Sequence, residues 1–241
     1  MTGLLRALGA VGAYYAILFA ATVLTFRIGA PPEDTGDVLW SLLPVQLALF
    51  CLCAVYVSRC ASWRAIGFGR VHWRGFVWLI PSCVVLALMA ISLLPHVPGL
   101  ARAPGTLLLL VAVPALIGIT EEIMFRGILL RAAMARLPLF SAMLLSATLF
   151  ALMHGIIGIG GQPVIVTSQQ VAFAFLVGVF LAPIAVETRS LWGVIIWHGV
   201  WDFLVYASQI AGITHHYALI GIMIQALVSV WLWARLVRAQ T

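Results

Sequence analysis

The chain has 241 residues, of which 64% are hydrophobic and 8% are charged, whereas about a quarter of the residues of a soluble domain are charged. The net charge is +6, but the arginines stand in short connections beside apolar segments, where positive charge sets membrane orientation, so nucleic-acid binding is set aside. All thirteen basic residues are arginine, which excludes Schiff-base and Ser-Lys chemistry. The composition predicts an all-α, polytopic transmembrane helix bundle.

Apolar segments long enough to cross a bilayer, about 20 residues each, recur along the whole chain. We expect eight of them in a single domain of residues 1–241. The first is longer than the apolar core of a cleaved signal peptide, so we expect it to be retained. The expected spans, with approximate ends, are residues 8–26, 38–57, 76–94, 106–138, 140–153, 171–184, 191–206 and 217–236.

The connections predict the orientation of the bundle. We expect polar or irregular connections at residues 31–34, 59–74 and 96–105, flexible or closely packed glycine-rich backbone at 155–161, and a kink at Pro81. Eight spans with both termini in the cytoplasm place ten arginines on the cytoplasmic side and only Arg27 and Arg102 on the other. The four cysteines lack metal-type spacing, so we interpret them as small apolar packing residues.

Six ionisable residues fall in or at the end of these apolar spans. Placing an ionisable side chain in the membrane costs at least a few kcal/mol, so we expect these residues to have a function. Their concentration on three helices indicates a shared polar cavity inside the membrane. They are Glu121, Glu122, Arg126, His154, His198 and Asp202.

The fourth span carries two adjacent carboxylates and a guanidinium. Glu122 and Arg126 are four residues apart with the acid first, which places them on one helix face as an ion pair. A purely structural salt bridge is the alternative interpretation of this pair. Glu121 is rotated by about 100° from Glu122 around the helix axis, so its charge is less well neutralised by Arg126. Because two carboxylates in a low dielectric do not both ionise easily, we expect Glu121 to be the general base.

The seventh span repeats the four-residue spacing with His198 and Asp202, so that the carboxylate can orient the imidazole ring. His154 ends the fifth span, and either histidine taken alone could be a packing or interfacial residue. Two chemistries suit the whole set. One is activation of a water by a glutamate and a histidine, with donors from a third helix stabilising an oxyanion. The other is a divalent metal such as zinc held by Glu121, His154 and His198, although no H-E-x-x-H spacing occurs.

The motifs Glu121-Glu122-x-x-x-Arg126, Phe150-x-x-x-His154 and His198-x-x-x-Asp202, in this order on separate helices, resemble the CPBP family of intramembrane proteases. That family includes the CAAX prenyl endopeptidases of the Rce type and Abi-like bacterial members. The resemblance covers about residues 115–205. It implies an endopeptidase whose site lies in the membrane and opens to the cytoplasm.

The resemblance also implies roles for the residues. Glu121 would activate the water with His154, Glu122 and Arg126 would support that pair, and His198 with Asp202 would line an oxyanion hole. Prenyl-processing members have asparagine where this chain has Asp202. An ionised aspartate repels an oxyanion, so Asp202 is either protonated or orients His198, which then donates. We favour the mechanism without a metal.

Two other functions stay open at this stage: a non-catalytic binding or immunity factor of the same fold, and a proton-coupled transporter. For an enzyme, the expected partners are membrane lipid and a peptide or protein substrate, which could be lipidated or carry a sorting signal. We expect the protein in a bacterial or archaeal inner or plasma membrane. Trp197 and Trp201 are candidates for a substrate groove or for lipid-facing positions.

Overall fold

The computed structural model describes residues 3–29, 32–100, 104–214 and 217–238. Helices make up nearly all of these ranges, and no strand occurs in them. Eight helical spans in the described residues are long and apolar enough to cross a membrane, which confirms the predicted all-α, polytopic architecture.

The first half of the chain forms three spans and a short connecting helix. The helices are α1 (Gly3–Val23) with the π-helical turn η1 (Leu24–Ile28), α2 (Thr35–Cys60), the π-helical turn η2 (Arg64–Phe68), the 3-10 helix η3 (Trp73–Leu79) continued by α3 (Ile80–Leu93), the 3-10 turn η4 (Leu94–His96) and α4 (Val97–Leu100).

The second half contains the other five spans. The helices are α5 (Pro104–Glu122), the π-helical turn η5 (Ile123–Leu129) and α6 (Leu130–Met134) as one continuous span, then α7 (Leu139–Met153) with the 3-10 helix η6 (His154–Gly160), α8 (Val164–Thr188), α9 (Trp192–Ala211) and α10 (Tyr217–Arg238).

The fifth and sixth spans are longer than predicted. The glycine-rich stretch after Met153 is closely packed, one of the two expected alternatives, and continues the fifth span as a 3-10 helix: a Cβ on Gly160 would lie 3.1 Å from the ring of Phe26. The sixth span begins at Val164, seven residues earlier than expected. Pro163 precedes its first residue, and proline is favoured at helix starts.

Two other segments also differ from the prediction. The helix that carries the acidic pair ends at Met134 instead of continuing to Pro138, since a residue before proline is disfavoured in the helical region. The expected turn at 96–105 is helical as far as Leu100 and includes residues outside the described ranges. Just before Pro81, where a kink was expected, the helix changes from the 3-10 to the α form.

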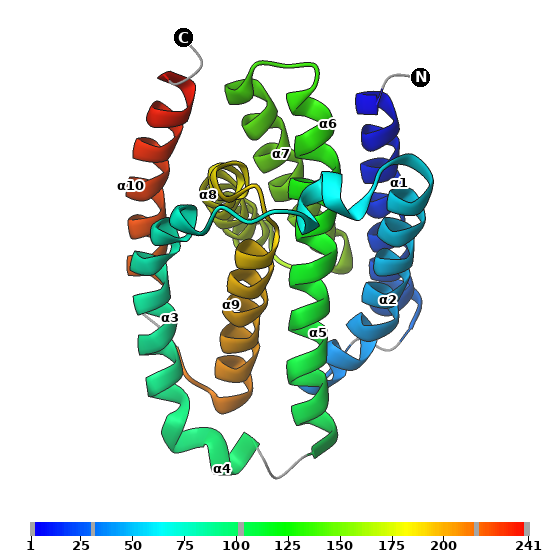
Figure 1. Cartoon of the computed structure of the whole chain (residues 1–241). Coiled ribbons are helices and arrows are strands. Elements are labelled where there is room, and N and C mark those ends of the chain that lie inside the picture. The colour runs from blue at the N-terminus through cyan, green and yellow to red at the C-terminus, as the bar shows by residue number, and fades with distance from the viewer. Residues whose placement is uncertain (1–2, 30–31, 101–103, 215–216, 239–241) are drawn as a thin grey trace.

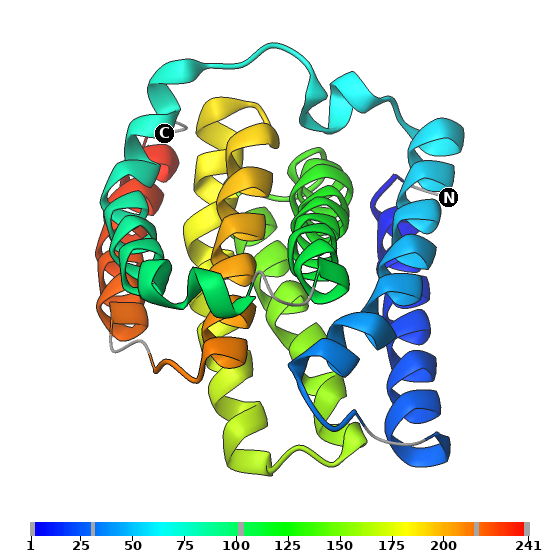
Figure 2. The same ribbon diagram turned by 90° about the horizontal axis from the view of Figure 1, so that it is seen from below.

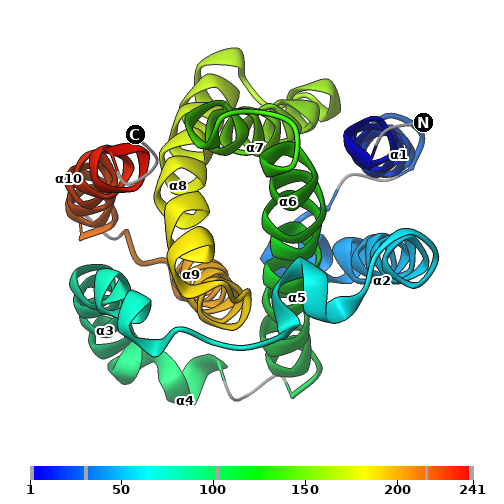
Figure 3. The ribbon, with the colours of Figure 1, turned by 45° about the horizontal axis from the view of Figure 1, so that its top comes forward.

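The span formed by α5, η5 and α6 stands in the middle of the bundle with α7, α8 and α9 around it (Figure 3). Helices α1 and α2 flank this group on one side, and α3 and α10 pack together on the other (Figure 2). Helix α8 is strongly tilted and is seen almost end-on in Figure 1. The outer pairs therefore cover two sides of the central group, while α7 and α8 keep exposed apolar residues such as Leu152 and Phe173.

The start of α1 and the end of α10 lie at the same end of the bundle, at the top of Figure 1. The ends of α2 and α6 also point toward this end, so that Arg6, Arg59, Arg131, Arg235 and Arg238 belong to segments near it, whereas Arg27 follows α1 at its other end. Arg102 lies outside the described residues. The distribution of charge has the asymmetry of the positive-inside rule.

Candidate active site

The acidic pair lies at the junction of an α-helix and a π-helical turn. Helix α5 ends at Glu122, and η5, which includes Arg126, begins at the next residue. A π-helical turn is rare and is frequent at functional sites, because the extra residue per turn changes the direction of the side chains. Every residue of η5 is buried. The local backbone therefore aims the charged side chains into the protein interior.

Helices α5 and α9 cross in close contact at two glycines. A Cβ built on Gly118 would lie 2.8 Å from the backbone N of Gly199 and 2.9 Å from the carbonyl O of Ile195, so no larger residue fits without a shift. Small residues let the backbones of membrane helices approach in this way. Gly118 precedes Glu121 by one turn, and Gly199 follows His198. The crossing thus brings the two polar motifs together.

Glu122 is the centre of the polar cluster. Its Oε1 accepts a hydrogen bond from Nη1 of Arg126 at 2.7 Å and another from Nδ1 of His198 at 2.8 Å. Glu122 and Arg126 are fully buried, and His198 is 5% exposed. The spacing on one helix indicated the contact with Arg126. The contact with His198 joins α5 to α9 and could not be read from the sequence.

The second ring nitrogen of His198 faces two carboxylates without a direct hydrogen bond to either. Nε2 lies 3.7 Å from Oε2 of Glu121 and 3.6 Å from Oδ2 of Asp202. Oε2 of Glu121 is buried and has no hydrogen-bond partner among the described residues. Asp202 is the more open of the two, with a side chain that is 20% exposed. Glu121 is thus the less neutralised carboxylate of the adjacent pair.

His154 joins the cluster through an aromatic ring. Its Nδ1 lies 3.0 Å from the carbonyl O of Phe150, to which only a protonated nitrogen can donate, so Nε2 is the free nitrogen of the neutral ring. The Phe150 ring packs edge-on against His154 at 5.1 Å and against His198 at 5.8 Å. It also lies 4.1 Å below the guanidinium carbon of Arg126, in a cation–π contact. Phe150 therefore connects three of the polar residues.

A second buried polar group supports α5 from its other side, and sequence reasoning missed it. The Thr120 hydroxyl donates to Oε1 of Gln46 at 2.7 Å and accepts from the Tyr14 hydroxyl at 3.3 Å. All three side chains are buried. Polar residues in the first two apolar spans were the available signal, because a buried polar group in a membrane needs a partner. The group ties α1 and α2 to the helix that carries Glu121.

The alternative metal site has no support from the disposition of the ligands. Within the described ranges, no group of three or more His, Cys, Asp or Glu side chains is placed to hold a metal ion. The set of Glu121, His154 and His198 is therefore not arranged as a ligand cluster.

Trp197 is buried in the bundle and is not lipid-facing, whereas Trp201 is partly exposed. The indole N of Trp197 donates to Oγ of Ser82 at 3.0 Å, and its ring stacks on Trp201 at 5.4 Å. Trp197 is 2% exposed and Trp201 is partly buried. Because Ser82 also accepts from Gln225 of α10 at 3.3 Å, Trp197 joins α9 to α3 and α10.

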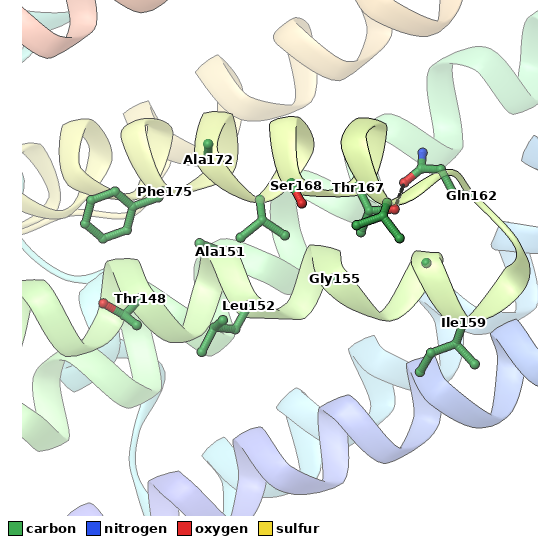
Figure 4. Close-up of a pocket in the computed structure, with 13 residues that line it drawn as sticks. Thr148, Ala151, Leu152, Gly155, Ile159, Gln162, Thr167, Ser168, Ala172 and Phe175 are labelled. Carbon is green, nitrogen blue, oxygen red and sulfur yellow. Dashed lines mark hydrogen bonds between the residues drawn. The ribbon is translucent and has the colours of Figure 1, made fainter.

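An apolar groove of about 590 Å³ runs between α7 with η6 on one side and α8 on the other. Figure 4 shows Leu152, Gly155 and Ile159 on one of these helical segments and Ser168, Ala172 and Phe175 on the other. None of the six ionisable residues lines this groove, although its lining includes the neighbours of His154. It is therefore a separate feature on the adjacent face of the helix that carries His154.

Residues 103–204 match the family model described as "Type II CAAX prenyl endopeptidase Rce1-like". This range contains the helix crossing and all six ionisable residues. The match confirms the resemblance to the CPBP/CAAX family of intramembrane proteases that the three motifs indicated, over this part of the chain. No curated protein and no solved structure matches the chain.

Proposed function

We propose that the protein is an intramembrane endopeptidase that hydrolyses a peptide bond of a membrane-associated peptide or protein, with water activated by Glu121 and His154. The match of residues 103–204 to the prenyl endopeptidase family model supports a CAAX-type protease. The observation that carries the mechanism is the division of labour between the two adjacent glutamates. Oε1 of Glu122 accepts two hydrogen bonds, whereas no hydrogen bond to Glu121 occurs among the described residues; Oε2 is without a partner in both carboxylates. A general base needs such a free oxygen.

The two histidines suit different roles in this proposal. Nδ1 of His154 donates to a backbone carbonyl, which leaves Nε2 as an acceptor that can orient the water together with Glu121. Nδ1 of His198 donates to Glu122, so the ring can donate a second hydrogen bond only from Nε2, when it carries both protons. In that form Nε2 is the donor for the oxyanion.

The reaction then follows from the positions of these groups. Glu121 takes a proton from water, and the resulting hydroxide attacks the substrate carbonyl carbon. His198 stabilises the negative charge that develops on the carbonyl oxygen. The protonated Glu121 gives its proton to the leaving amine as the C–N bond breaks. Asp202, 3.6 Å from Nε2 of His198, favours the doubly protonated ring and so acts by positioning and charge rather than by donation.

We also propose that the end of the bundle rich in arginine faces the cytoplasm. The membrane we propose is a bacterial or archaeal inner or plasma membrane. The substrate would reach the site from that side, as is expected for the family. The membrane placement of the six ionisable residues requires a substrate segment that enters the bilayer or lies at its surface.

Cleavage by the full-length protein in proteoliposomes tests this function. The probe is an internally quenched peptide with a farnesylated C-terminal Cys-aliphatic-aliphatic-X sequence, and the same peptide without the prenyl group tests the substrate class. We expect Glu121→Gln and His154→Ala to lower kcat by at least about 100-fold, the usual contribution of general acid–base catalysis. Glu33→Gln, a charge-matched change at an exposed site, should leave cleavage unchanged.

Cleavage at the wild-type rate by Glu121→Gln would refute the assigned base. If the wild type cleaves neither peptide, but a cellular phenotype survives Glu121→Gln, the non-catalytic binding factor is favoured. Uptake of a solute coupled to a proton gradient would instead favour the transporter.

A further inference from the structure

A second cavity of about 590 Å³ lies at the arginine-rich end of the bundle, away from the six ionisable residues of the site. It is lined by the connection between α2 and α3, by α6 and the start of α7, and by the ends of α8 and α10. We call it the arginine pocket. Its charged and titratable lining residues are Arg64, Arg70, His72, Arg131, Glu187 and Arg189.

The positive charge of the arginine pocket is not neutralised within the protein. No salt bridge joins any of its four arginines to a carboxylate in the described part of the chain. Its one acidic residue, Glu187, pairs instead with Arg235 at 3.0 Å. Nη2 of Arg131 donates to the carbonyl O of Ala185 at 2.9 Å, but its Nε is buried and lacks an acceptor among the described residues. Several guanidinium donors are therefore free for an anion.

The walls of the pocket are held by backbone hydrogen bonds. His72 N donates to Thr188 O at 2.9 Å, and Leu191 N donates to Gly67 O at 3.1 Å, which join the α2–α3 connection to the turn between α8 and α9. Figure 3 shows this connection crossing over α5 and α9. Gly67 has a φ of +123°, and a Cβ there would lie 2.9 Å from Cγ of Leu191. The arrangement of the lining is thus set before any ligand binds.

Arg189 has an unusual backbone conformation at the pocket. Its φ of 54° makes it the one non-glycine residue with positive φ in the described ranges. An L-residue in this region costs about 1–2 kcal/mol, which glycine would avoid. Residues held in such conformations cluster at functional sites. A guanidinium at this position is therefore maintained against the local backbone preference.

The apolar part of the lining identifies the source of the anion. Met134, Leu139, Val186 and Leu236 complete the cavity at the ends of four spans, so that a charged head and an apolar tail can both be accommodated. Guanidinium groups bind phosphate oxygens in a bidentate manner. Basic pockets between membrane helices at the cytoplasmic side suit anionic headgroups. We propose that the arginine pocket binds the phosphate of an anionic phospholipid headgroup, a site that is distinct from the proposed protease site.

The test is a binding measurement on the full-length protein in detergent, by native mass spectrometry with dioleoyl phosphatidylglycerol as the probe and phosphatidylcholine as the reference lipid. We expect one saturable phosphatidylglycerol site. Arg64→Gln with Arg70→Gln should weaken it by about tenfold or more, because two charge-assisted bonds are lost. Arg59→Gln with Arg74→Gln, the same charge change beside the same connection but outside the lining, should stay within about twofold of the wild type.

Three results would overturn the proposal. Equal weakening of phosphatidylglycerol binding in both double variants would show that the lipid responds to the overall positive charge of this surface and not to the arginine pocket. Competition by inorganic phosphate at the concentration of the lipid would show a free-phosphate site, and displacement by an acidic peptide at a lower concentration would show a protein partner. If the glutamine variant is not monodisperse, Arg64→Lys with Arg70→Lys replaces it. Unchanged binding in that charge-conserving variant would contradict bidentate recognition. Because the readout is binding, the result is independent of whether any peptide is cleaved.

Discussion

Replacing Glu122 tests the buried network on which the site depends. In Glu122→Gln, the shared oxygen at 2.7 Å from Arg126 and 2.8 Å from His198 loses its charge. The buried guanidinium, whose Nε and Nη2 already lack partners among the described residues, is then uncompensated. Breaking a buried pair of this kind costs about 3–5 kcal/mol. The same change at Glu121 removes a buried carboxylate whose only ionic contact among the described residues is 3.7 Å to His198; the desolvation cost that is relieved offsets the contact that is lost, so we expect a loss below about 1 kcal/mol.

A thiol-reactive dye can follow this unfolding in detergent. Cys53 is fully buried on α2, and the other three cysteines are exposed. Changing those three to alanine leaves Cys53 as the only thiol that can report unfolding. Its Sγ lies 3.7 Å from Thr120 O on α5, the helix that carries Glu121 and Glu122. At about 2–4 °C per kcal/mol for a chain of this size, Glu122→Gln should lower the Tm by roughly 10 °C.

The comparison of the two glutamates decides the outcome. We expect Glu121→Gln to stay within about 3 °C of the parent while it loses catalysis. Equal Tm values for Glu122→Gln and the parent, or equal losses in both variants, would refute the assignment of Glu122 as the structural partner and Glu121 as the free base.

The other predictions concern the metal, the helix crossing and the second polar group. The rate of cleavage after dialysis against EDTA should stay within about twofold of the rate before dialysis. If dialysis abolishes cleavage and added zinc restores it, the mechanism without a metal is contradicted. Gly118→Ala should cost about 1–3 kcal/mol and lower kcat, because its Cβ would meet the backbone of α9 at 2.8 Å, whereas Gly12→Ala, with no atom within 4 Å, should change neither. Gln46→Leu should lower the free energy of unfolding by about 1 kcal/mol, since the Thr120 hydroxyl can still donate to Ile117 O at 3.2 Å; a loss above about 3 kcal/mol would show that this interpretation is wrong.

The local sequence pattern was sufficient to predict the membrane spans and the side-chain contacts within one helix. The number of spans follows from apolar length, and the Glu122–Arg126 contact follows from a four-residue spacing. Boundaries were less predictable where packing overrides propensity. The glycines after Met153 allowed either flexible or closely packed backbone, and the contacts with α1 and α8 decided for a closely packed 3-10 helix.

The sequence by itself determined the class of architecture, the six ionisable residues and the family motifs, because hydrophobic length and intrahelical spacing are local properties. Only the tertiary structure decided that His198 donates to Glu122, that Phe150 lies between Arg126 and the two histidines, and that four arginines from three segments line one pocket. These contacts join residues far apart in the chain. They depend on how closely helices cross, as at Gly118, and no spacing along one helix encodes that distance.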